Sequence, residues 1–240
     1  MLQKPLKYHW NNDELIDLLA RVSFAEGSLL TEMLHLPETT YAEMRANAQN
    51  KEFDGLNADT ARRACEYGMG TGFAITIDSL KSWNNSEFRA DCADEVAELL
   101  TFVNDEDLAH PIIRTAVANA WLLSLKPFAK NNDLTARYLL LAMLSKHEHI
   151  SERFYSLTEA FSTDESTYRQ ALQTTLQGDK NLTKWIYFFL NSMMKAIQKS
   201  LMKYVRSVMK TAQEKYKMNY MEAKIVDNSV KLDNIKENKR

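Results

Sequence analysis

Two strongly apolar segments separated by a short polar loop limit what this chain can fold into. The segments span residues 112–125 and 134–145, and each is apolar on nearly every side of a helix. Pro127 ends the first helix, because proline has no N–H to donate and disfavours α geometry in the residue before it. Residues 131–133 supply turn and N-cap chemistry for the second helix. Helices with so little polar face normally lie in a core, so we expect these two at its centre.

The rest of the chain is also predicted to be helical. Only 6 Gly and 4 Pro occur in 240 residues, which favours helices with few tight turns. The sequence has no convincing β-strand pattern and no internal repeat. We therefore expect an all-α fold, with further helices over residues 13–34, 40–51, 58–83, 92–103, from about 154, 164–177, and from 183 until the apolar pattern fades near 216.

Three glycines, Gly68, Gly70 and Gly72, fall inside the predicted helix of residues 58–83. Each costs roughly 1 kcal/mol relative to alanine in a helix. They indicate either a close approach of another helix or a local kink. They do not form a dinucleotide-binding motif, because no strand precedes them and their spacing is wrong.

Composition excludes several classes of protein. The net charge of −2 gives no overall indication of nucleic-acid binding. Cys65 and Cys92 have no metal-binding spacing, and both are predicted to be buried free thiols in a reducing compartment. The N-terminus lacks the apolar region of a signal peptide, and the longest apolar run, residues 185–190, is too short to span a bilayer. We expect a cytoplasmic protein with no membrane partner.

The loop between the two central helices presents backbone amides and a helix N-terminus, which together favour binding of an anion such as phosphate. Its residues 126–137 resemble the signature loop of the Fic (Fido) family, His-x-Phe-x-(Asp/Glu)-Gly-Asn-Gly-Arg-x-x-Arg. Weaker similarities occur in the family's order outside the loop, so the resemblance covers roughly residues 8–210. They lie at residues 9–11, 25–30, 110–116, 153–158 and 177–190.

The resemblance implies a fold, an organisation and an activity. The fold would be a Fic-like helical bundle around the two central helices. It would comprise an N-terminal helical region (1–56), a core (57–217) and a polar, flexible tail (218–240). In working family members the loop histidine is a general base for a target hydroxyl that attacks the α-phosphate of ATP. The acidic residue holds Mg²⁺, and the Gly-Asn-Gly amides and two arginines hold the phosphates.

This chain departs from the signature at the positions that carry the chemistry. Lys126 stands where the general-base histidine belongs, and Lys130 stands where the metal-binding carboxylate belongs. A protonated lysine cannot accept a proton, and it repels a metal cation. Asn131 and Asp133 replace the glycines, and Leu134 replaces the first arginine. The matching residues, a remnant of the nucleotide site, are Phe128, Asn132 and Arg137.

Two regulatory and substrate-binding elements of the family are also altered. Residues 83–89 run directly into the next helix, which leaves no room for the β-hairpin flap that docks a target segment. The family's inhibitory motif, (Ser/Thr)-x-x-x-Glu-(Gly/Asn), corresponds here to Asn50, Asp54 and Gly55. Asp54 either pairs with Arg137 or belongs to a simple Asp-Gly turn, which we favour. Arg137 itself is either a phosphate ligand or, as we favour, a surface or ion-paired arginine.

Three other groups of residues have both a structural and a functional interpretation. A basic stripe is either a solvated helix face, which we favour, or a site for nucleic acid or an acidic partner. A methionine cluster is either core packing, which we favour, or a soft groove for a partner. His147 and His149 point apart on a helix, so we do not expect a metal site. The stripe comprises Lys199, Lys203, Arg206 and Lys210, and the cluster comprises Met193, Met194, Met202, Met209 and Met218.

These features predict a catalytically inactive Fic-like domain with a structural, binding or regulatory role. Its partner would be a protein, such as an active homologue or a second copy of the chain, and no cofactor is expected. The alternative is an enzyme that uses ATP and Mg²⁺ to transfer AMP or another phosphate-containing group to a protein hydroxyl, with Lys126 deprotonated by burial. A further alternative is a nucleic-acid-binding accessory that uses the basic stripe.

Overall fold

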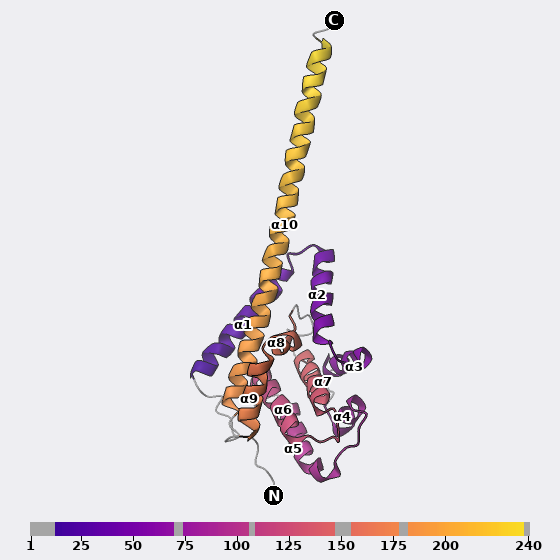
Figure 1. Ribbon diagram of the computed structural model, residues 1–240, viewed down its shortest axis with the longest axis vertical. Helices are drawn as coiled ribbons and strands as arrows, with labels where there is room; N and C mark the ends of the chain where they lie inside the picture. The colour runs from indigo at the N-terminus through magenta and orange to yellow at the C-terminus, as the bar shows by residue number, and fades with distance from the viewer. Residues whose placement is uncertain (1–12, 70–73, 106–108, 147–154, 178–181, 238–240) are drawn as a thin grey trace. The chain divides into compact units, whose positions relative to one another are not determined.

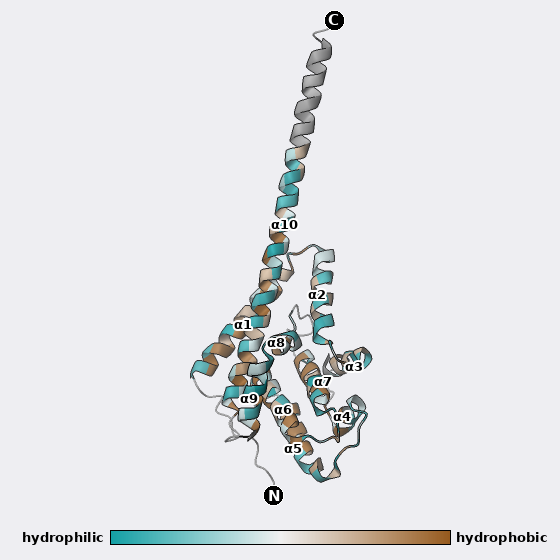
Figure 2. Ribbon diagram, in the orientation of Figure 1, coloured by the Kyte–Doolittle hydropathy of each residue, from teal (hydrophilic) through white to brown (hydrophobic). Residues whose placement is uncertain are grey.

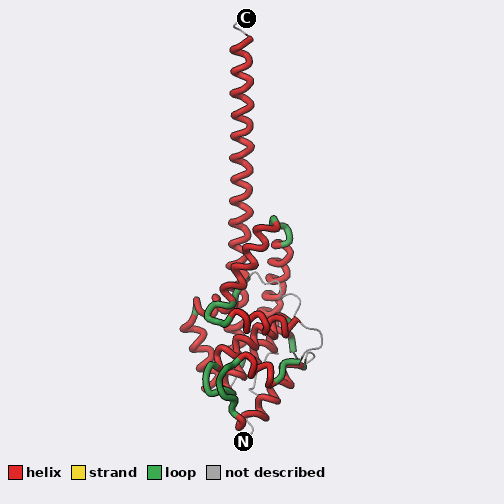
Figure 3. Tube along the Cα trace, turned by 90° about the vertical axis from the view of Figure 1, so that its right-hand side faces the viewer, coloured by secondary structure: helices red, strands yellow, loops and turns green. Residues whose placement is uncertain are grey.

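The computed structural model is all-α, as predicted (Figures 1 and 3). It describes residues 13–69, 74–105, 109–146, 155–177 and 182–237, with side chains over the same ranges except residues 68–69, 177 and 222–237. The helices are α1 (Asp13–Met33), α2 (Glu38–Glu52), α3 (Ala58–Met69), α4 (Ile77–Trp83), the 3₁₀ helix η1 (Ala90–Cys92), α5 (Ala93–Asn104), α6 (Pro111–Leu125), α7 (Asn132–Ser145), α8 (Leu157–Thr163), α9 (Glu165–Gln177) and α10 (Thr183–Glu237).

The chain divides into two compact units, Met1–Gln198 and Lys199–Arg240. The boundary falls inside α10. Residues of α10 up to Gln198 bury large apolar side chains in the first unit, including Trp185, Phe189 and Met193. From Lys199 the second unit consists, in its described part, of the continuation of this helix.

Helices α6 and α7 form the core of the first unit (Figure 1). Every residue of α6 from Ile112 to Leu123 is buried, and so are most residues of α7. Helix α7 packs against α6 and α3, and α6 packs against α5. Figure 2 shows apolar residues concentrated on α5, α6 and α7. The nearly all-apolar character that made these segments prominent in the sequence is therefore matched by burial on nearly every side.

An aromatic cluster joins α8, α9 and the first part of α10. Phe161, Tyr168, Trp185, Phe188 and Phe189 have ring centroids 5.5–6.4 Å apart. The indole N–H of Trp185 donates a hydrogen bond of 2.7 Å to the carbonyl oxygen of Ala116 on α6. This bond satisfies the polar atom of a fully buried side chain. The cluster therefore anchors these three helices to the central pair.

The predicted single helix over residues 58–83 is wrong, because the chain forms two helices there, α3 and α4. Thr76 begins α4 with a capping box: its Oγ1 accepts from the Ser79 N–H at 3.2 Å, and the Ser79 Oγ accepts from the Thr76 N–H at 3.1 Å. This reciprocal pair satisfies two amides that a continuous helix would have bonded internally. Gly68 lies in the last turn of α3, and Gly70 and Gly72 lie outside the described residues.

Helix α10 extends further than the apolar pattern predicts. The pattern fades near Tyr216 and residues 218–240 were expected to be a flexible tail, but the helix continues to Glu237. No Gly or Pro occurs after residue 182, so no residue in this stretch imposes a stop. None of the helices in the described part of the chain combines the length and apolar content needed to cross a bilayer.

Candidate functional site

The loop between α6 and α7 contains the two non-glycine residues with positive φ in the described part of the chain. Lys126 ends α6 with φ 48°, and Asn131 precedes α7 with φ 60°. Asn131 stands at a position where the Fic signature has glycine. Glycine adopts this left-handed conformation freely, and asparagine tolerates it better than most residues. The backbone at Asn131 is therefore of the kind that a glycine would favour.

Asn132 shapes the loop by a different kind of bond from a helix cap. Of residues 131–133, which were expected to supply the N-cap of the second central helix, Asn131 is the N-cap, but it makes no side-chain capping bond. Asn132 is the first residue of α7, and its amide group bonds back to Phe128. Its Nδ2 donates to the Phe128 carbonyl at 2.8 Å, and its Oδ1 accepts from the Phe128 N–H at 2.9 Å. The side chain thus closes the five-residue turn from which the ring of Phe128 enters the core.

The segment between α4 and η1 lies against the loop. Its described residues form one extended segment that makes an isolated antiparallel bridge, Phe88 to Phe128, rather than a hairpin. The Arg89 N–H donates to the Pro127 carbonyl at 2.8 Å, and the Ala129 N–H donates to the Glu87 carbonyl at 2.9 Å. The rings of Phe88 and Phe128 meet edge to face, 5.5 Å apart. The loop is therefore paired with another part of its own chain.

Asn84 is the residue that joins this segment most firmly to the loop, and the sequence analysis missed it. Its Nδ2 lies within hydrogen-bond distance of the Lys130 carbonyl (3.0 Å), the Asn131 carbonyl (3.3 Å) and the Thr135 Oγ1 (2.8 Å). Its Oδ1 accepts from the N–H and the hydroxyl of Ser86. The run Asn-Asn-Ser indicates a turn, but nothing in it identifies which asparagine is buried or where it bonds.

The consequence is that three amides of the loop are already bonded within the chain. Phe128 N–H donates to Asn132, Ala129 N–H donates to Glu87, and Lys130 N–H donates to the Ser86 hydroxyl at 3.1 Å. Lys126 and Lys130 are both exposed. Among the residues described, no group of three His, Cys, Asp or Glu side chains is placed to hold a metal ion.

His110 caps the helix that leads into the loop. Its Nδ1 accepts a hydrogen bond of 3.3 Å from the Ile112 N–H, which satisfies one of the free amides at the start of α6. Partial burial of the imidazole, together with the positive charge of Arg114, lowers the pKa of His110 below its ordinary value of 6.5. The ring is therefore held neutral, as an acceptor must be.

Arg137 lies beside the end of α2, as the family's inhibitory contact implies, but the contact differs in kind. Its Nη2 donates to the backbone carbonyls of Asp54 (2.6 Å) and Glu52 (3.3 Å) and to the Thr158 hydroxyl (3.3 Å). The alternative of an ion pair with the Asp54 carboxylate is not observed among the described residues. Gly55 has φ 70° and follows the end of α2, in agreement with the Asp-Gly turn.

The third residue of the inhibitory-motif remnant, Asn50, makes no contact among the described residues that would support the motif, whereas the neighbouring Glu52 does bond to α8. Asn50 is exposed on α2. Glu52, by contrast, is buried, and its Oε2 accepts from the Thr158 N–H at 3.2 Å. The sequence analysis missed Glu52, because a glutamate near a helix end is normally solvated. It ties the start of α8 to the same place where Arg137 bonds α2.

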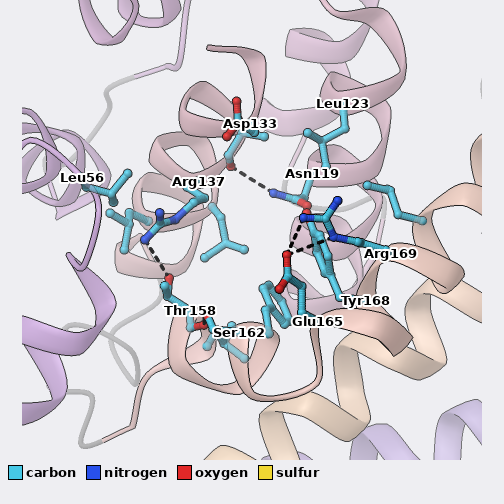
Figure 4. Close-up of a pocket in the computed structure, with 16 residues that line it drawn as sticks. Leu56, Asn119, Leu123, Asp133, Arg137, Thr158, Ser162, Glu165, Tyr168 and Arg169 are labelled. Atoms are coloured by element: carbon cyan, nitrogen blue, oxygen red, sulfur yellow. Dashed lines mark hydrogen bonds and ion pairs between the residues drawn. The ribbon is translucent and has the colours of Figure 1, made fainter.

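A cavity of about 540 Å³ lies along α7, on the side formed with α6, α8 and α9 (Figure 4). Six of its sixteen lining residues are leucines: Leu56, Leu123, Leu140, Leu141, Leu157 and Leu172. A volume of this size is within the range of small-molecule sites. No sequence pattern indicates this cavity, since the same leucines satisfy a helical core pattern whether the core is filled or open.

Polar and charged side chains also line this cavity. Asp133 and Arg137 reach it from α7, and Glu165, Tyr168 and Arg169 reach it from α9 (Figure 4). Arg169 pairs with Glu165, its Nη2 at 2.5 Å from the carboxylate. Burial, together with the negative charge of Asp133, raises the pKa of Tyr168 above its ordinary value of 10. The phenol therefore remains a protonated donor at physiological pH.

The remaining candidate residues divide between buried and exposed positions. Met193 is buried in the core, whereas Met202, Met209 and Met218 are exposed, so the core interpretation of the methionine cluster holds only in part. Cys92 is buried, but Cys65 is only half-buried. All four residues of the basic stripe are exposed. His147 and His149 lie outside the described residues.

A scan against protein-family models finds no match for this chain. No curated protein is similar enough in sequence to count as a relative. The resemblance to the Fic family therefore rests on the residues of this chain alone.

Proposed function

We propose that this chain is a Fic-like helical domain that does not transfer nucleotides and instead serves as a binding or regulatory module for a protein partner. The observation that carries the proposal is the bonding of the loop. The amides of Phe128, Ala129 and Lys130, which directly precede the positions of the family's Gly-Asn-Gly, donate to groups of the chain itself and hold the loop against residues 86–87.

The substitutions act in the same direction as the hydrogen bonds. The bond between the Lys130 N–H and Ser86 closes the loop at the position where the family has its metal-binding carboxylate. Any rearrangement of the loop around an ATP phosphate would have to break these bonds, and exchanging a satisfied amide for a ligand contact recovers little free energy. The loop is better suited to joining α6 to α7 than to holding an anion.

The alternative of an enzyme with altered chemistry depends on Lys126 being buried. Lys126 is exposed at the end of α6, so the desolvation that would make it a base is not provided. The nucleic-acid alternative retains one supporting feature, the exposed basic stripe on α10. We favour a protein partner over both.

The test is titration of the full chain with ATP and Mg²⁺ in a calorimeter, together with incubation of the chain and acceptor proteins with α-labelled ATP. We expect no binding heat and no label on any protein. Tight Mg²⁺-dependent binding of ATP, or label transfer by the unmodified chain, would contradict the proposal.

A variant that restores the signature provides the matched control. It carries Lys126→His, Lys130→Asp, Asn131→Gly, Asp133→Gly and Leu134→Arg, and circular dichroism checks that it folds. If the bonded loop prevents nucleotide binding, this variant stays inactive, because the partners of all three amides remain. Adding Ser86→Ala frees the Lys130 N–H, so any gain in ATP binding should come with this change.

A further inference from the structure

The second unit carries an unusual distribution of charge and exposed apolar surface. Residues 199–240 contain 11 of the 30 Lys and Arg but 5 of the 32 Asp and Glu, a net charge of +6, whereas residues 1–198 carry −8. The overall charge of −2 hides this asymmetry. A domain-scale asymmetry of this kind indicates an interaction with an oppositely charged surface.

Five of the eight exposed large apolar residues of α10 in this unit form one stripe; Val208, Met218 and Met221 lie outside it. Met202, Val205, Met209, Tyr216 and Tyr220 are spaced by three, four, seven and four residues, so they lie on one side of the helix. Their exposed fractions run from 41% to 74%. We call these five residues the apolar stripe. Arg206, Lys210 and Lys217 lie along one edge of it.

A second exposed apolar surface lies on the first unit. Of its large apolar side chains, the most exposed are Ile16 (45%), Phe24 (79%) and Leu34 (72%), which lie on α1 or immediately after it. We call these three residues the α1 face. Residues 13–34 hold five carboxylates and one arginine; Glu26 is buried, so the exposed charged groups are four carboxylates and the arginine, a net charge of −3. This surface is therefore the acidic counterpart of the apolar stripe.

We propose that the chain self-associates, with the apolar stripe of one copy packing against the α1 face of a second copy. The two surfaces match in length, because 21 residues of α1 extend about 31 Å and the 19 residues from 202 to 220 extend about 28 Å. In a reciprocal dimer, the apolar stripe of each copy would cover the α1 face of the other copy, which makes two equivalent contacts.

Charge decides among the possible pairings. A contact between two stripes brings together two units of +6, and a contact between two α1 faces brings together two surfaces whose exposed charged groups sum to −3. The crossed contact alone joins opposite signs. A membrane or a nucleic acid would engage the basic helix but would leave the α1 face exposed. The proposal is independent of the proposed function, since ATP binding involves neither surface.

The test is sedimentation equilibrium of the full chain over a wide range of concentration, at low and high salt. We expect a dimer whose dissociation constant rises with salt, because the charges at the edge of an apolar contact are screened. Met209→Asp in the stripe and Phe24→Asp in the α1 face should each raise the dissociation constant at least about tenfold.

Two controls make the test specific. Met221→Asp changes charge as Met209→Asp does, but Met221 lies on the basic side of α10 and should leave association unchanged. An equimolar mixture of the Met209→Asp and Phe24→Asp chains should associate more tightly than either alone, because one stripe and one α1 face remain intact. Thermal melting verifies the fold, and Leu34→Asp replaces Phe24→Asp if that variant is unstable.

Several results would overturn the proposal. A monomer at every concentration would do so, and binding of that monomer to phosphatidylserine vesicles or to duplex DNA would assign the basic helix to a membrane or a nucleic acid instead. A mixture that associates no better than its components would show that like surfaces pair. Equal loss of association in Met221→Asp would show that charge alone, and not the stripe, drives it.

Discussion

The loop before α7 and the cavity along α7 differ in the environment of their polar groups. The loop bonds its amides to Asn132, Glu87 and Ser86, all within the chain. The cavity is lined by both apolar and polar side chains, among them an exposed ion pair, Glu165 with Arg169. The loop therefore acts as a rigid connection between α6 and α7, and the open cavity is the better place for a ligand. Substitutions in the two regions should therefore differ in their effect on stability.

The largest effect is expected from Asn84→Ala. This side chain is buried and bonds two loop carbonyls, the Thr135 hydroxyl and Ser86. Its loss leaves buried polar groups without their partner, so the free energy of unfolding should fall by about 3 kcal/mol. Denaturant unfolding measures the change. The neighbouring Asn85 is exposed, and Asn85→Ala should change stability by less than about 0.5 kcal/mol. If the two variants lower the free energy of unfolding equally, the hydrogen bonds of Asn84 do not stabilise the loop.

Asn84 also shows which parts of the fold could be predicted from sequence. The central pair α6 and α7 was predictable, because apolar residues lie on nearly every side of each helix and favour burial. The contact of Asn84 with Thr135 joins positions 51 residues apart, and no local pattern encodes it. The same holds for Glu52 with Thr158. For the cavity, leucines at core spacing are identical in sequence whether or not their neighbours fill the space between them.

Asn132→Ala should have the second-largest effect. It removes both the donor to the Phe128 carbonyl and the acceptor for the Phe128 N–H, and we expect a loss of about 2 kcal/mol in unfolding free energy. Asn132→Asp keeps the acceptor and adds a favourable charge at the start of α7, so its loss should be smaller. The two variants are compared by denaturant unfolding. If the aspartate variant is the less stable one, the side chain does not close the turn as described.

Asn131 tests the backbone of the loop rather than its hydrogen bonds. Its φ of 60° is costly for alanine and free for glycine. Asn131→Ala should lower the unfolding free energy by about 1 kcal/mol, whereas Asn131→Gly should leave it unchanged or raise it slightly. Melting temperatures of the pair provide the measurement. Similar values for glycine and alanine would mean that the left-handed conformation is not required.

His110 should make the stability of α6 depend on pH. Because its pKa is lowered in the folded state, the unfolded chain binds the proton more readily, and stability falls as pH decreases. The contribution is complete above 6.5 and is lost as pH falls through the lowered pKa, with a loss of up to about 1 kcal/mol, the usual value of a helix cap. Unfolding at neutral and acidic pH measures it. His110→Asn caps without titrating, so its stability should change less with pH over this range.

The smallest effect on stability is expected at the rim of the cavity. The side chains of Arg169 and Glu165 are 75% and 61% exposed, and an ion pair so exposed contributes little. Glu165→Gln should therefore change the free energy of unfolding by no more than about 0.5 kcal/mol, as measured by denaturant unfolding. We expect the substitution to affect ligand binding instead, because it removes the ion-pair partner of Arg169, whose guanidinium lines a cavity of about 540 Å³. The melting temperatures of both chains are then measured with each member of a small library of apolar carboxylic acids. These acids should raise the melting temperature of the Glu165→Gln chain more than that of the unmodified chain. A large loss of stability in this variant would mean that the cavity rim, like the loop, stabilises the fold. It would contradict the expected difference between the two regions.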